Sequence, residues 1–161
     1  MRKGKEMLKY METIVLMHKS YRKQTHLLTE SLKSAMWGDI VKYEGLYDEF
    51  IQSFPNDLSR LQEIAESTSA EPSDGMHIMF GMVVMPFLME LLENREETKL
   101  KAAFCFFERM AEADDSMISE VLEFTIFEDI ISRGKSTLDR CKTYMGQKSL
   151  EHCSVVEKYM M

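Results

Sequence analysis

The sequence predicts an all-α fold, with about eight helices packed as antiparallel helical hairpins in a single domain, as a compact bundle or a short HEAT-like stack. Only seven Gly and three Pro occur among 161 residues, so few positions interrupt a helix. Apolar residues recur at spacings of three and four in most segments, which is the period of a helix with one buried face. The connections between these segments are short and therefore favour antiparallel neighbours.

Residues 1–36 form a basic amphipathic segment, for which we predict one long helix or two nearly collinear helices. Apolar residues follow a heptad-like spacing from Met7 to Ala35, and His18 and Thr25 interrupt that seam. Residues 1–33 hold eight Lys/Arg and three Glu, whereas the rest of the chain holds 12 basic and 24 acidic residues. The segment is therefore expected to dock on the acidic domain of residues 37–161 or, in a homodimer, on a second copy.

The first half of the acidic domain divides at its turn-forming residues. A helix that Asp39 can cap ends at Pro55, and a short helix follows from Asp57. Residues 67–75, STSAEPSDG, have the composition of a loop. An apolar helix begins at Met76, and Pro86 within it should produce a kink.

The second half continues with helices whose ends are marked by caps and glycines. Asn94 and Glu97 have the spacing of a cap pair for a helix that reaches Ala111. Asp114 and Asp115 lie where negative charge favours the start of the next helix. Gly134 interrupts the chain, a short helix runs from Ser136 to Gly146, and a last helix completes the domain.

The segment EVLEFTIFEDII, residues 120–131, is apolar on nearly every side when drawn as a helix. Such a helix is expected to be buried among several neighbours. Glu123 falls between Phe127 and Ile130, so its confined carboxylate needs a hydrogen-bond donor or a raised pKa. We favour an internal pair with Lys or Arg, or a side chain that reaches solvent. A general acid, a partner-binding acid and a short strand over 122–126 stay open as alternatives.

No catalytic motif is present. The chain lacks a Gly-rich phosphate loop, HExxH and GxSxG, and the acidic pairs Glu90/Glu93 and Glu120/Glu123 lack the His of a di-iron site. We therefore expect no enzyme activity, no cofactor and no metal. Three Cys without a CxxC pair indicate reduced thiols and a cytoplasmic location. The most apolar window, residues 78–89, is shorter than the roughly 20 residues of a membrane span, so no transmembrane segment is expected.

Four stretches, LYDEFIQSFP, MFGMVVMPFLMELLE, FCFFERMAEADDSMISEVLEFTIFED and YMGQKSLEHCSVVEKY, carry a family resemblance. From about residue 43 to 159 the chain resembles an uncharacterised, all-helical bacterial family of unknown function, met in settings that suggest toxin-immunity proteins. The resemblance implies helical hairpins and a binding role. It supplies no catalytic residues, and residues 1–36 lie outside it.

The charge layout indicates a protein partner. An acidic body repels nucleic acid and suits a basic protein, because attraction between opposite charges accelerates association. We therefore predict an interaction or regulatory module, which could be an immunity-type protein that neutralises its partner. The alternative is a small enzyme whose active site is assembled from distant residues and is not recognisable from sequence. A pocket lined by Glu108, Glu123 and His77 would support that alternative. The candidate interaction or confined acidic residues are Glu108, Asp114, Asp115, Glu120, Glu123 and Glu128.

Overall fold

The computed structural model describes residues 41–160, and the predictions for residues 1–36 lie outside that range. The described residues form helices and no strand, which confirms the all-α class and removes the strand alternative for residues 122–126. Seven continuous helices are present in this part of the chain, one fewer than the eight expected for the whole chain. They comprise η1 Tyr43–Gly45 with α2 Leu46–Gln52, α3 Leu58–Thr68, α4 Met76–Met79 with η3 Phe80–Val84 and α5 Met85–Glu93, α6 Glu97–Glu112, α7 Ser116–Val121 with η4 Leu122–Phe127 and α8 Glu128–Ser132, α9 Lys135–Lys142, and α10 Gln147–Met160.

Two of these helices contain a π turn near the middle. In the first, η3 joins α4 to α5, and in the second, η4 joins α7 to α8. Pro86 is the second residue after η3; it has no N–H to donate to the carbonyl one turn earlier, and its ring would clash with that carbonyl. A wider turn at this point relieves the clash, so the irregularity predicted from Pro86 takes the form of a π turn within a continuous helix.

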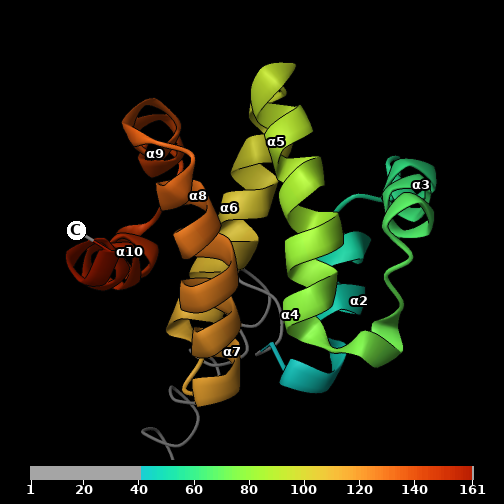
Figure 1. Cartoon of the computed structure of the whole chain (residues 1–161), viewed down its shortest axis with the longest axis horizontal. Coiled ribbons are helices and arrows are strands. Elements are labelled where there is room, and N and C mark those ends of the chain that lie inside the picture. Colours follow the sequence, from blue (N-terminus) through green and yellow to red (C-terminus); the bar gives the residue numbers. More distant parts are fainter. Residues whose placement is uncertain (1–40, 161) are drawn as a thin grey trace, which may run out of the picture. The chain divides into compact units, whose positions relative to one another are not determined.

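The helices lie side by side with the two π-containing helices at the centre (Figure 1). Helix α6 runs back between them, so α4–η3–α5 and α7–η4–α8 point in the same direction. Helices α2 and α3 pack on one side of this centre, and α10 packs on the other against α6, η4 and α8. The three central helices therefore alternate in direction, as the short connections predicted, whereas α3, α9 and α10 cross them at a steep angle (Figure 1).

The core is rich in phenylalanine. Phe50 contacts the rings of Phe80, Phe106 and Phe107 at centroid distances of 5.4–6.2 Å, which joins α2, η3 and α6. Phe107 and Phe127 are fully buried, as the three-four spacing predicts. Burial of side chains this large supplies much of the driving force for folding.

Three predicted helix ends differ from the structure. Helix α6 starts after Glu96, and Asn94 instead ends α5, so the Asn94–Glu97 cap pair is wrong. Arg95 adopts a left-handed backbone conformation with φ of 57° and turns the chain between α5 and α6. Asn94 is therefore separated from the start of α6 and does not cap it. Helix α3 extends to Thr68 into the predicted loop, and α9 begins at Lys135, one residue early.

The helix from Met76 to Glu93 is longer than the apolar window within it. By length and composition this 18-residue helix could cross a membrane, and it is the one such helix found in residues 41–160. Core helices meet the same criterion, and 56% of this one is buried inside the domain.

Candidate functional site

The two π turns meet where Gly81 faces Thr125. His77 Nδ1 and Thr125 Oγ1 are 2.6 Å apart and form a hydrogen bond between the two helices. A Cβ atom on Gly81 would lie 3.4 Å from the methyl carbon of Thr125, which is an ordinary van der Waals contact, so the two helices approach closely here. Single π turns occur frequently at functional sites, and this protein places two in contact.

Four exposed apolar side chains lie on one side of this junction. Because the helices run in the same direction and His77 faces Thr125, the residue after His77 and the residue before Thr125 turn toward the same side. Those residues are Ile78 and Phe124. Met82, one turn after Ile78, and Met117, two turns before Phe124, lie on the same side. We call this surface the π face; its members are exposed by 39% (Ile78), 40% (Met82), 49% (Met117) and 55% (Phe124).

The exposure of Phe124 corrects the prediction that its segment is buried all round. Helix α7–η4–α8 has neighbours on the sides of Val121, Ile126 and Ile130, which are fully buried. Phe124 projects between the side that meets α4 and the side that meets α10, and more than half of it is exposed. A helical wheel drawn from the sequence identifies the apolar positions of this helix. It does not show which sides of the helix have a packed neighbour.

Acidic residues frame the π face. Glu120 lies one turn before Phe124 and is exposed, and Glu128 lies one turn after it and is half-buried. Asp114 is exposed before the helix, and the carboxylate of Asp115 caps it by accepting from the backbone N–H groups of Met117 and Ile118. Neither π-containing helix includes a Lys or Arg, and residues 110–132 hold seven acidic side chains and no basic one.

Glu123 has an internal partner, although not one of the predicted type. Its Oε1 lies 2.5 Å from Nδ1 of His152 on α10, and both side chains are about three-quarters buried. The pair borders a cavity of about 390 Å³ between α6, η4 and α10. The carboxylate is thus confined and paired, as expected, but the partner is a histidine rather than Lys or Arg.

Glu108 serves the fold. Its two carboxylate oxygens accept from the backbone N–H groups of Lys148 and Ser149 at 2.8 and 2.9 Å, which caps α10 from a different helix. Glu108, Glu123 and His77 therefore each have separate partners and do not assemble one pocket. The pocket that would have supported the enzyme alternative is therefore not formed by these three residues.

Metal and thiol chemistry find little support in residues 41–160. This part of the chain contains no group of three or more His, Cys, Asp or Glu side chains that could hold a metal ion. Cys105 is exposed, whereas burial raises the thiol pKa of Cys153 and raises that of Cys141 to about 12. The two buried thiols are accordingly protonated and unreactive near neutral pH.

A protein-family model matches most of this chain. A family model described as a domain of unknown function, DUF7674, matches residues 47–160. The chain belongs to the DUF7674 family. The match confirms the resemblance to an uncharacterised helical family and covers both the π face and the Glu123–His152 pair of this DUF7674 domain. Searches of the curated proteins and of the solved structures give no significant match.

Proposed function

We propose that the domain is a protein-binding module whose π face holds a basic, amphipathic segment of a partner protein. The observation that carries the proposal is the exposure of Phe124, a large aromatic side chain that protrudes from the junction of two π turns. Aromatic residues that become buried on binding dominate the energy of many protein interfaces.

The surroundings of Phe124 support the choice of partner. Ile78, Met82 and Met117 extend the apolar surface, and flexible Met side chains adapt to the shape of a bound partner. Glu120 and Glu128 flank Phe124 along its own helix without a basic residue nearby in sequence. A helix with apolar residues on one face and Lys or Arg on its borders complements this arrangement.

We also propose an immunity-type role, which the family resemblance suggests. In an immunity-type role, the basic partner would be a toxin, and the domain would neutralise it by covering its surface. A cytoplasmic location is part of this proposal. So is the absence of a nucleic-acid partner, because the described residues carry a net charge of −11.

Site-specific crosslinking in the native host tests the proposal. A photo-crosslinking amino acid replaces Phe124 in the full chain. In the control it replaces Leu58 on α3, another apolar residue, which is exposed by 46%. We expect a single protein to be captured at position 124 and not at 58, with the crosslink in a basic amphipathic segment. Crosslinks to residues 1–36 of the same chain or of a second copy, or equal capture at both positions, contradict the proposal.

Binding by the purified partner then gives the energetic test. Truncating Phe124 to Ala should weaken affinity by about 30-fold, the effect of a central aromatic anchor of roughly 2 kcal/mol. Glu120→Lys should also lower the affinity for the partner, while Leu58→Ala should leave the affinity unchanged. An immunity-type role additionally requires that the wild-type domain, and not Phe124→Ala, protects cells from the partner.

A further inference from the structure

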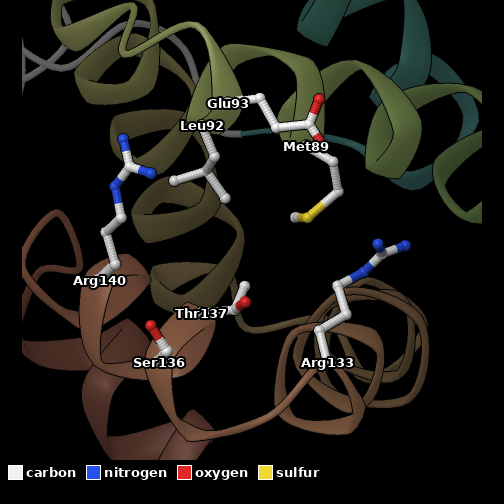
Figure 2. A pocket seen from close by; sticks show the side chains of 7 residues that line it. All are labelled: Met89, Leu92, Glu93, Arg133, Ser136, Thr137 and Arg140. Atoms are coloured by element: carbon white, nitrogen blue, oxygen red, sulfur yellow. The ribbon is translucent and has the colours of Figure 1, made fainter.

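A second cavity, of about 440 Å³, lies between α5 and the start of α9, apart from the π face (Figure 2). Its walls combine cationic, hydroxyl and apolar groups. The lining residues are Met89, Leu92, Glu93, Arg133, Ser136, Thr137 and Arg140. A volume of this size accommodates a small organic molecule.

Two arginines stand on opposite sides of the cavity, with Ser136 and Thr137 between them (Figure 2). Asp129 accepts from Nε and Nη2 of Arg133 at 2.7 and 3.3 Å, which orients that guanidinium and leaves its Nη1 outside the pair. Arg140 is half-buried on the second turn of α9. Guanidinium and hydroxyl groups that line one cavity are suited to an oxyanion.

The start of α9 adds further donors to the same place. Its N-cap is Gly134, which has no side chain to accept from the first backbone N–H groups of the helix. The hydroxyls of Ser136 and Thr137 lie in this first turn. These hydroxyl and backbone N–H donors, together with the two arginines, suit the several oxygens of a phosphate group.

The charge around this cavity is unlike that of the rest of the domain. Residues 133–142 hold four basic side chains and one acidic one, whereas residues 41–160 together carry a net charge of −11. The acidic background opposes diffuse anion binding. An anion that binds this domain should therefore bind at this cavity.

Glu93 and two apolar residues define the remainder of the ligand. Among the described residues Glu93 forms no ion pair with Arg133 or Arg140, although all three line the cavity. Its carboxylate can accept from an amine, and Met89 and Leu92 offer apolar surface for a short carbon chain. We propose that this cavity binds a small phosphate monoester that also carries an amine, independently of the protein partner at the π face.

Titration of the full chain tests this site. The probes are phosphoethanolamine, inorganic phosphate, ethanolamine, and glycerophosphoethanolamine, a soluble diester with the headgroup of a lipid. We expect saturable binding of phosphoethanolamine by calorimetry, weaker binding of inorganic phosphate and of the diester, and none of ethanolamine. Preference for the diester would point to a lipid headgroup and overturn the monoester assignment, and no saturable binding at millimolar concentration would overturn the site.

Variants identify the groups that bind. Arg140→Gln and Arg133→Gln should each weaken phosphoethanolamine binding by about tenfold or more, because each removes a charge-assisted hydrogen bond. Lys158→Gln, the same charge change at an exposed position on α10, should have no effect. Glu93→Gln should reduce the affinity for phosphoethanolamine to that for inorganic phosphate. Circular dichroism checks the fold of each variant, and an equal loss in Lys158→Gln would show that only net charge mattered.

Discussion

At the scale of single residues, Gly146 and Glu108 illustrate a requirement for space. A Cβ atom at position 146 would lie 2.6 Å from either carboxylate oxygen of Glu108, well inside the normal contact distance. Glycine here lets the carboxylate reach the two N–H groups that begin α10. Its role is therefore to admit a side chain from α6, and its backbone needs no left-handed conformation.

This arrangement predicts the effect of three substitutions on stability. Glu108→Ala and Gly146→Ala should each lower the free energy of unfolding by about 1–3 kcal/mol, since both leave the start of α10 uncapped. The double variant should cost much less than the sum, because the two changes remove the same interaction. Ser149→Ala is the control: it keeps the backbone donor and removes a buried hydroxyl that has no hydrogen-bond partner within residues 41–160, so it should not lower the free energy of unfolding. Urea denaturation measures all four variants, and additive effects would show that Glu108 and Gly146 do not act through the same cap.

The cysteines give a prediction about reactivity and pH. In the folded protein at pH 8 a thiol reagent should modify exposed Cys105 quickly and leave Cys141 and Cys153 unmodified. Burial raises the pKa of both buried thiols, so the reactive thiolate forms only at much higher pH, near 12 for Cys141. Mass spectrometry with and without denaturant counts the modified positions. Rapid modification of Cys141 under native conditions would show that this part of the core opens readily.

At the scale of helices, Phe124 and Phe127 belong to one π turn and have opposite environments. Phe127 is fully buried, and Phe124 is exposed by 55%. The same π turn therefore places one phenylalanine in the core and the other on the surface. A contiguous exposed apolar surface is typical of an interaction site, which is the reason that we propose the π face as the site of partner binding.

Alanine substitutions separate these environments. Phe127→Ala, and Phe107→Ala in α6, should each lower the free energy of unfolding by about 3–5 kcal/mol, because they leave cavities in a packed core. Phe124→Ala removes a side chain of equal size from the surface and should cost less than about 1 kcal/mol. Chemical denaturation provides the comparison. A large loss at Phe124 would mean that this side chain is buried by a part of the protein and is not available to a partner.

At the scale of the whole molecule, charge is segregated along the sequence. Residues 110–132 are acidic without a basic residue, and residues 133–142 are predominantly basic. Glu120 and Glu128 of the first group lie one turn from Phe124 on the π face, and Arg133 and Arg140 of the second group line the cavity at α9. Two binding sites of opposite charge preference can therefore coexist on a domain that is acidic overall.

Salt should affect partner binding mainly through the rate of association. Raising ionic strength from low to physiological values shortens the range of electrostatic attraction to about 8 Å and should slow association with the basic partner several-fold. The dissociation rate should change little, because apolar contacts at Phe124 hold the complex. Stopped-flow measurements at several salt concentrations test this. An association rate that does not vary with salt would remove the acidic frame from the recognition mechanism.

Deletion of residues 1–36 tests the predicted role of the basic segment. By sequence we expect the shortened protein to expose apolar surface and to lose stability or aggregate, while high salt alone should leave the full-length protein unchanged. Light scattering and thermal unfolding compare the two proteins. A soluble fragment with unchanged stability would favour an unattached segment. Liposome and DNA binding by the isolated peptide at two salt concentrations would then distinguish its targets.

The sequence by itself determined the helical class, most helix positions, the buried aromatic residues and the asymmetric distribution of charge. These properties depend on local periodicity, on Gly and Pro, and on composition, which are all visible along the chain. The N-cap at Asp115, the break at Gly134 and the burial of Phe107 and Phe127 follow from such local signals.

Only the tertiary structure decided which apolar and acidic side chains meet a neighbour. Glu108 accepts from backbone N–H groups 40 and 41 residues away, and Glu123 pairs with His152 at a separation of 29. Phe124 is more than half exposed, although the helical wheel predicted that its side of the helix would be buried. The physical reason is that burial and pairing depend on which helices lie alongside in three dimensions. A sequence pattern gives the face of each helix but not the identity of what packs against it.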